Sequence, residues 1–469
     1  MIDELKPESK ILLVSLLKKF GSEKPFCWSI DEIIKEFGST KNVVTTLFKT
    51  LVKEELVTIT KEFKMRGKGR NIYLFKQSID SAVQEDVLLK KIMLSKDPVV
   101  ESVLFNNFDD KVFTVGEKIK KLRSSNRLFI LILLLHADKM GRVSDLSVAN
   151  ISKMMGGISR DRYKSQLDVL LTTKLVSYKV SGLTGKAMFG KIKGKIYLNY
   201  NHLLFTINPP SISLLTIEIA HTNLGSSDSE ATALLRYSQY YLTHVNKKQM
   251  NNQFSWPDCL QPCVQYVDMD LILPFLEDKV VHDQLQLLLI ELASEMLSIN
   301  RSNLDEVFFS PTMKVLLSWE KLMPSNMLKK HSNEFEQLVD IGKLFRNRTS
   351  DWRGFRQNQF SEAVFSYIEL IVLLIHISRK IAFRFKSLLA LVEIELDDSS
   401  QIMIAPHFQH DLSMHKFVIY YSSSNKCDNT EVFIDTNINK RINGGGPKLI
   451  LADNLKERLR DVSLRIGNT

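Results

Sequence analysis

The sequence predicts a mainly α-helical protein with small β-hairpins in its N-terminal half. Apolar residues recur at helical spacing through most of the chain, and between about 211 and 396 their stripes are broad, which favours a helical bundle. Two shorter stretches repeat one pattern of helices followed by strand-like runs. The 44% hydrophobic and 25% charged content is typical of a globular chain, and 469 residues exceed one ordinary core. We therefore expect several domains.

Changes in pattern and composition divide the chain into five predicted segments. Pro209 and Pro210 mark the boundary before the largest of them, because proline ends regular elements. The last segment changes character and holds strand-like runs at 417–424 and 431–438. The segments are a first domain at 1–78, a helical linker at 79–119, a second domain at 120–208, a helical bundle at 209–399 and a small α/β segment at 400–469.

The sequence of the first domain predicts three helices followed by a β-hairpin. Apolar spacing predicts a helix over 8–20, and the capping-box residues Ser29 and Glu32 open a short second one. A third helix is predicted over 39–54, after a glycine that ends the second. Two strand-like runs follow within 57–75, joined by a basic loop that contains glycines.

The helix predicted over 39–54 has one apolar face and one polar, basic face. A helix of this kind can bury one side and place the other in a major groove of DNA. Its outward side chains Asn42, Thr46 and Lys49 are of the types that bind base edges and phosphates. Basic residues of the following hairpin extend the same surface, and they are Lys64, Arg66, Lys68 and Arg70.

The domain at 120–208 repeats this order with different residues. A Gly-Gly corner precedes a helix predicted over 158–173, and a longer hairpin is predicted over 175–199. Tyr163 and Leu167 belong to the buried stripe of that helix. The predicted outward residues of the helix are Ser159, Arg160, Arg162, Ser165 and Gln166, and the hairpin carries Lys186, Lys191, Lys193 and Lys195.

Positive charge is concentrated in the two repeated domains. Residues 120–208 hold 16 Lys and Arg against 4 Asp and Glu, and residues 1–78 hold 15 against 10. Residues 209–399, by contrast, hold 18 against 24. Because phosphates attract Lys and Arg whatever the base sequence, we expect the repeated domains to bind double-stranded DNA. A merely solvated charged face on a small helical domain is the alternative interpretation.

Helix, helix and hairpin in this order resemble the winged helix-turn-helix superfamily of DNA-binding proteins. The resemblance is one of fold pattern and covers roughly 5–78 and 120–205. It implies that both domains bind DNA through a recognition helix and a basic wing. Wing lysines then contact the backbone or the minor groove. The chain also resembles the tandem winged-helix plasmid replication initiators, although its long helical region departs from their plan. Residues expected to read bases are Asn42, Arg160, Arg162 and Gln166.

We therefore expect a DNA-binding protein that acts as a sequence-specific transcriptional regulator. Its helical region is expected to form a homo-oligomer or to bind a protein partner. A replication or partition initiator that binds repeated sites is the alternative within the same chemistry. A scaffold subunit whose winged helices dock protein is the alternative from another functional class.

Four arginines within 346–357 form a second basic cluster, beside Trp352 and Phe355. Such a mixture can bind phosphate or stack on bases, but ion pairs with the surrounding acidic helices are the favoured interpretation. The cluster consists of Arg346, Arg348, Arg353 and Arg356.

No motif indicates a cofactor, a metal site or a catalytic site. Cys259 and Cys263 lack a second pair of ligands, and three histidines between 407 and 415 lack carboxylates at matching spacing. The glycines at 444–446 lack the arrangement of a phosphate-binding loop. We predict no enzymatic activity, no cofactor and no bound metal.

The sequence gives no indication of a membrane segment or of export. The longest uncharged apolar run, 128–137, is well short of the roughly 20 residues that span a bilayer. No basic N-terminal stretch leads into an apolar stretch with a cleavage site, and four cysteines are too few for a disulfide framework. We expect a cytoplasmic protein without a membrane partner.

Overall fold

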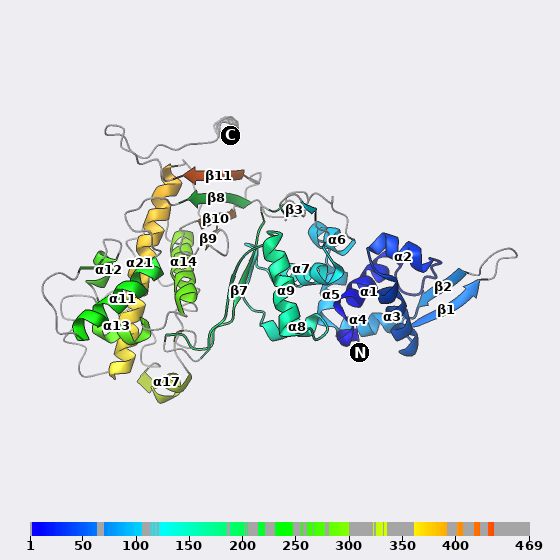
Figure 1. Cartoon of the computed structure of the whole chain (residues 1–469), viewed down its shortest axis with the longest axis horizontal. Coiled ribbons are helices and arrows are strands. Elements are labelled where there is room, and N and C mark those ends of the chain that lie inside the picture. Colours follow the sequence, from blue (N-terminus) through cyan, green and yellow to red (C-terminus); the bar gives the residue numbers. More distant parts are fainter. Residues whose placement is uncertain are drawn as a thin grey trace. The chain divides into compact units, whose positions relative to one another are not determined.

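The chain is mainly helical and separates into two compact units (Figure 1). The N-terminal unit comprises Met1–Ser177 and Lys195–Ser211, and the C-terminal unit comprises Tyr178–Gly194 and Ile212–Thr469. The computed structural model describes residues 2–62, 70–105, 114–115, 118–119, 122–184, 188–200, 202, 204, 214–220, 230–246, 255–256, 260–265, 267–276, 281–299, 322, 325–331, 333–334, 361–391, 401–406, 417–422 and 430–435.

Several predicted sites lie outside the described residues. They are the hairpin residues Lys64, Arg66, Lys68 and Lys186, the arginine cluster of 346–357, Cys259, the three histidines between 407 and 415, and the glycines at 444–446. No helix among the described residues is both long enough and apolar enough to cross a bilayer.

The first predicted domain has the expected order of elements. After a short 3-10 helix, η1 (Ile2–Glu4), come α1 (Pro7–Phe20), α2 (Ile30–Phe37), α3 (Lys41–Lys53), β1 (Val57–Glu62) and β2 (Arg70–Phe75). β1 and β2 pair antiparallel, with Thr58 opposite Leu74, and Phe26 bridges to Tyr73. The capping box at the start of α2 is confirmed, and Gly38 ends that helix in the left-handed conformation.

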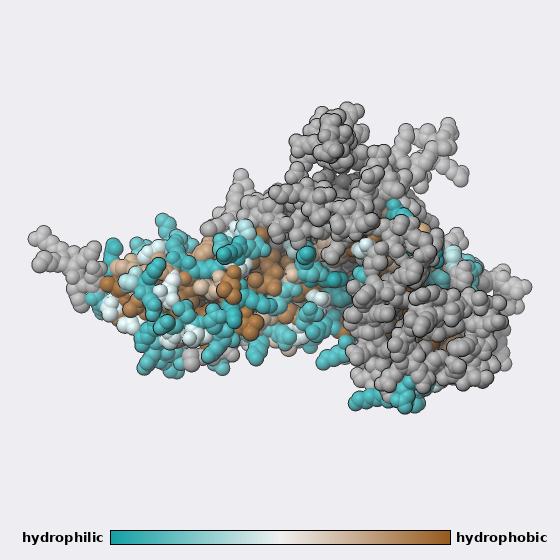
Figure 2. All heavy atoms as spheres, turned by 180° about the vertical axis from the view of Figure 1, so that it is seen from behind, coloured by the Kyte–Doolittle hydropathy of each residue, from teal (hydrophilic) through white to brown (hydrophobic). Residues whose placement is uncertain are grey.

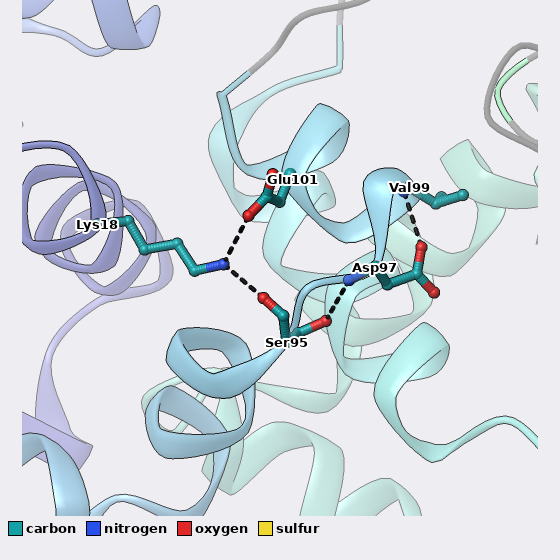
Figure 3. A network of polar contacts seen from close by, with 5 residues as sticks. All are labelled: Lys18, Ser95, Asp97, Val99 and Glu101. Atoms are coloured by element: carbon teal, nitrogen blue, oxygen red, sulfur yellow. Dashed lines mark hydrogen bonds and ion pairs between the residues drawn. The ribbon is translucent and has the colours of Figure 1, made fainter.

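The segment at 79–119 holds three helices and two very short strands. They are α4 (Ser78–Glu85), α5 (Val87–Leu94), α6 (Pro98–Phe105), β3 (Thr114–Val115) and β4 (Lys118–Ile119). Polar contacts attach the connection between α5 and α6 to α1 (Figure 3). Lys18 Nζ donates to the carbonyl oxygen of Ser95 at 2.8 Å and lies 3.3 Å from Glu101 Oε1. This segment is therefore packed into the N-terminal unit.

The second repeated domain follows the order of the first, with an additional short strand between its first two helices. Its elements are α7 (Ser124–His136), β5 (Arg142–Val143), α8 (Val148–Met154), α9 (Arg160–Thr172), β6 (Val176–Val180) and β7 (Lys195–Leu198). The three strands form one sheet in the order β5-β7-β6. The helix predicted over 158–173 begins two residues later than expected, after its N-cap Ser159.

One hydrophobic core extends through the whole N-terminal unit. α1 packs against α7, and buried residues of both repeated domains and of the segment between them belong to a single cluster. Arg127 of α7 is buried and donates to the carbonyl oxygens of Phe37 at 3.0 Å and Leu104 at 3.4 Å, which lie at the ends of α2 and α6. Burial lowers the pKa of Arg127 to about 10. The predicted boundaries around 79–119 thus divide residues that share one core.

A buried ion pair joins α1 to the start of α5. Lys10 Nζ lies 2.9 Å from Asp86 Oδ2, and the two side chains are only 1% and 8% exposed. The other carboxylate oxygen of Asp86 accepts from the backbone N–H groups of Leu88 and Leu89, which caps α5. Because neither charge is solvated by water, each is stabilised by the opposite charge of its partner.

The C-terminal unit combines helices with a four-stranded sheet. Its described helices are α11 (Glu230–Asn246), α12 (Gln261–Val264), α13 (Met269–Leu276), α14 (His282–Ile299), α17 (Ser325–Lys330) and α21 (Glu362–Leu391). The sheet has the order β11-β8-β10-β9. Its strands are β8 (Leu214–Ala220), β9 (Gln401–Pro406), β10 (Phe417–Ser422) and β11 (Thr430–Asp435).

β8 is a strand within the segment 209–399 that was expected to be a helical bundle. It pairs antiparallel with β10 and parallel with β11, so the two tail strands predicted from the sequence are confirmed and join a strand from far earlier in the chain. β9 packs on α14, where Ser294 Oγ accepts from the backbone N–H of Ile404 at 2.9 Å. The bundle and the tail are therefore parts of one unit.

Candidate nucleic-acid interface

α3 presents a polar, basic face to solvent. Val44, Leu47, Phe48 and Leu51 are buried, whereas the predicted outward residues Asn42, Thr46 and Lys49 are exposed. The 13 residues of α3 include three lysines and no carboxylate. Among the described residues, no ion pair involves Lys41, Lys49 or Lys53, so no described residue neutralises the charge of this face directly.

Aromatic contacts fix α3 against the hairpin that follows it. The rings of Phe48 on α3 and Tyr73 on β2 lie 4.3 Å apart, and Phe26 stacks on Tyr73 at 5.3 Å. Ring stacking of this kind adds to the stabilisation that burial provides. The exposed face of α3 and the strands β1 and β2 are therefore held in one arrangement.

The hairpin β1-β2 extends beyond the helices of its own unit (Figure 1). Arg70 is exposed at the start of β2, next to the loop that contains the other predicted hairpin cations. Arg70 is also near Glu32, whose pKa is lowered first by hydrogen bonds from the backbone and side chain of Ser29 and then by the positive charge of Arg70. This glutamate offsets part of the charge of Arg70, at the loop end of the hairpin.

α9 differs from α3 on its exposed face. When the N-caps Thr40 and Ser159 are aligned, the positions of Asn42 and Lys49 are occupied by Asp161 and Asp168. Both aspartates are exposed, and so are the predicted residues Arg160 and Ser165. Carboxylates at these positions repel phosphates, and the exposed face of α9 therefore carries mixed charge, whereas α3 has no carboxylate.

Gln166 is a wrong prediction, because its side chain is only 6% exposed. It stands three residues after buried Tyr163 and one before buried Leu167, so it falls inside the apolar stripe of α9. In the alignment by N-caps it takes the place of buried Leu47. Its Oε1 is buried without a hydrogen-bond partner among the described residues. The spacing of the apolar residues in α9 indicates that position 166 is buried, whereas the polarity of glutamine suggests exposure.

Two further predicted DNA contacts of this helix are engaged within the N-terminal unit. Arg162 Nη2 lies 2.6 Å from Glu8 Oε1 of α1, although the arginine side chain remains 43% exposed. Ser159 Oγ accepts from the backbone N–H of Arg162 at 3.2 Å and so caps α9. Arg162 thus already has an acidic partner, which corrects its assignment as an uncompensated base-reading residue.

The Gly-Gly corner before α9 is explained by backbone geometry. Gly156 and Gly157 have φ values of +76° and +75°, which side chains with a Cβ rarely adopt. Their N–H groups donate to the carbonyl oxygens of Lys153 and Ser152 and end α8. At Gly156 an added Cβ would also overlap the carbonyl oxygen of Leu5, whereas nothing lies within 4 Å at Gly157.

We expect Gly156→Ala to destabilise the N-terminal unit more than Gly157→Ala. Gly157→Ala should lower the free energy of unfolding by about 1 kcal/mol, from the left-handed conformation alone. Gly156→Ala should lower it by about 2 to 4 kcal/mol, because the segment at Leu5 must also move. Urea unfolding of the two variants measures the difference. Equal losses would show that the contact with Leu5 is absent in solution.

The hairpin expected to be a second basic wing is buried at its centre. Met188 and Phe189 are 0% and 1% exposed and belong to the core of the C-terminal unit. Tyr367 Oη donates to the carbonyl oxygen of Met188 at 3.4 Å, and Gln284 Nε2 donates to that of Ser181 at 2.5 Å. This part of the predicted wing therefore packs in a protein core.

The lysines of this hairpin are distributed differently. Lys191 and Lys193 are exposed, and Lys195 is half-buried. Lys193 and Lys195 both interact with other residues. Because the centre of the hairpin is buried, these lysines lie beside a packed segment and not on a loop that projects into solvent.

On the face shown in Figure 2, hydrophilic residues predominate over the described surface of the N-terminal unit, with hydrophobic residues interspersed. The most exposed large hydrophobic residues among those described are Leu94 and Val87, both on α5. Scattered apolar side chains of this kind are normal for a monomer. They do not by themselves indicate a docking site for a protein.

A serine, a histidine and a glutamate meet in the C-terminal unit. His331 Nδ1 lies 2.9 Å from Glu334 Oε1 and 3.0 Å from Ser361 Oγ. In a nucleophilic triad the serine and the carboxylate use different ring nitrogens. Here both partners meet the same nitrogen, and the backbone N–H of Ser361 also donates to Glu334. The group is arranged to fasten the start of α21 rather than to relay a proton.

No cluster of His, Cys, Asp or Glu suited to a metal ion occurs among the described residues. Comparison with protein-family models finds no matching family, and comparison with curated proteins finds no similar sequence.

Proposed function

We propose that the chain binds double-stranded DNA through α3 and the hairpin β1-β2, with α3 as the recognition helix of a winged helix. The observation that carries this proposal is the exposed face of α3, whose three lysines have no acidic partner among the described residues. Its buried stripe and its exposed polar residues suit a helix that packs on one side and enters a major groove on the other.

The second repeated domain is proposed to be a winged helix with a mainly structural role. Three observations favour this: Asp161 and Asp168 on the exposed face of α9, the ion pair of Arg162 with Glu8, and the burial of Met188 in its hairpin. One DNA-reading helix for each chain follows. A homo-oligomer formed through the helical unit would then supply a second copy of α3 for a two-fold symmetric site.

Binding of the full chain to a random duplex, measured at increasing salt, tests the proposal. Counterion release predicts that the affinity falls linearly with salt on logarithmic axes, with a slope of about 0.9 for each phosphate contacted. A negligible signal at low salt, or a signal that does not change with salt, would overturn it. In that case the mixed-charge face of α9 favours the second candidate, a scaffold that docks protein.

The biological role is proposed to be sequence-specific regulation of transcription, with replication or partition initiation as the alternative. Footprinting on bound genomic fragments separates the two roles. A single operator beside a promoter supports the regulator, and an array of repeated sites supports the initiator.

A further inference from the structure

The exposed residues of α3 present a specific set of chemical groups. Thr45 Oγ1 donates to the carbonyl oxygen of Lys41 at 2.7 Å, so its hydroxyl is satisfied by the helix itself. Thr46 Oγ1 donates to Asn42 Oδ1 at 3.4 Å, one helical turn away. Besides the lysines of α3, the groups left to face a ligand are the amide of Asn42 and the methyl groups of the two threonines.

The hydrogen bond from Thr46 also determines how the amide of Asn42 is turned. One lone pair of Oδ1 is used by the hydroxyl, which leaves the other lone pair and both N–H groups available. One donor and one acceptor side by side match adenine in the major groove, where N7 accepts and the N6 amino group donates. Thymine, its partner, presents a methyl group that packs against threonine methyls.

The same face has no arginine, the residue type that most often reads guanine. Its cations are Lys41, Lys49 and Lys53, which suit phosphates. Asn42 itself is exposed, and its only described side-chain partner is Thr46. Asn42 and the two threonines of this face are thus suited to an A·T base pair.

We propose that α3 reads A·T base pairs, with Asn42 contacting adenine, the methyl group of Thr46 contacting thymine, and the hydroxyl of Thr46 positioning the Asn42 amide. This inference rests on the proposed function, because it needs α3 in the major groove.

Selection of bound duplexes from a random pool, followed by binding of the selected sequence, provides the test. Wild-type protein should enrich an A·T pair, and 7-deazaadenine at that position, which lacks N7, should weaken binding by about 10-fold. Asn42→Ala should remove the preference for adenine over guanine, which is expected to be about 10- to 100-fold in the wild type.

Two substitutions of Thr46 separate its hydroxyl from its methyl group. Thr46→Val keeps a branched apolar side chain and removes the hydroxyl, so the adenine preference should fall by about 3- to 5-fold. Thr46→Ser keeps the hydroxyl, so the adenine preference should be retained, while discrimination between thymine and uracil, which lacks the methyl, should decrease. If Thr46→Val and Thr46→Ser had the same adenine preference, the positioning role of the Thr46 hydroxyl would be refuted.

The outcomes distinguish this inference from the function on which it rests. Absence of salt-dependent binding by the wild type defeats the proposed function itself. Salt-dependent binding combined with enrichment of G·C pairs, or with an unchanged selection by Asn42→Ala, defeats only the A·T inference. Circular dichroism of each variant checks that the protein is folded, and these exposed substitutions are expected to leave the spectrum unchanged.

Discussion

Replacement of Lys41 and Lys49 by glutamate should weaken binding to duplex DNA by about 100-fold at low salt and lower the salt slope by about two phosphate contacts. Both lysines are exposed on α3, and neither has an ion-pair partner among the described residues. Each substitution removes a cation and adds an anion that phosphates repel. Fluorescence anisotropy with a labelled duplex at several salt concentrations measures both quantities.

A matched control uses Lys90 on α5 and Lys153 on α8. Both are exposed and without an ion-pair partner among the described residues, and their replacement by glutamate changes the net charge by the same amount. This control should alter affinity by less than about 5-fold, through long-range electrostatics alone. If the control loses as much affinity as the α3 variant, net charge rather than the face of α3 governs binding.

Replacement of Lys10 by methionine should have the largest effect on stability. It leaves Asp86 buried and charged without its partner, and breaking a buried pair in this way costs about 3 to 5 kcal/mol. Hydrogen exchange in α1 and α5, measured on the full chain, reports opening of the N-terminal unit separately from the C-terminal unit. We expect protection in both helices to fall together.

The control for this substitution is Lys18→Met, which lies on the same helix. Lys18 pairs with Glu101, whose carboxylate is half-exposed, and donates to the carbonyl oxygen of Ser95, so the loss should be about 1 to 2 kcal/mol and smaller than at Lys10. The double variant Lys10→Met with Asp86→Asn should regain part of the stability, because asparagine can still cap α5 without burying a charge. No recovery in the double variant would mean that the pair's electrostatics do not explain the loss.

Local signals in the sequence predicted the helices and strands of the first repeated domain. The capping box of Ser29 and Glu32, the glycine at 38 and the spacing of Val44 and Leu47 each act over a single turn, so neighbouring residues suffice to identify them. The exposed face of α3 followed from the same spacing. Its lack of ion-pair partners required the structure, because partners can come from any part of the chain.

Features that depend on distant residues were not predictable in this way. The shared core of α1 and α7, the ion pair between Glu8 and Arg162, and the pairing of β8 with the tail strands join residues far apart in sequence. Gln166 is a different case, because a polar side chain stands within the apolar stripe of α9 and is buried with it.

Because residues 178–194 belong to the C-terminal unit, a cut at a single junction does not separate the two units. The polypeptide leaves the N-terminal unit after Ser177 and returns at Lys195, so the junction near Pro209 is not the only covalent connection between the two units. A fragment cut at Pro209 would keep Met188 and Phe189 but lose the helices that enclose them, while the complementary fragment would fold around an unfilled space. Proteolytic cleavage at this junction should therefore leave two fragments that stay associated, because neither fragment has a complete core by itself.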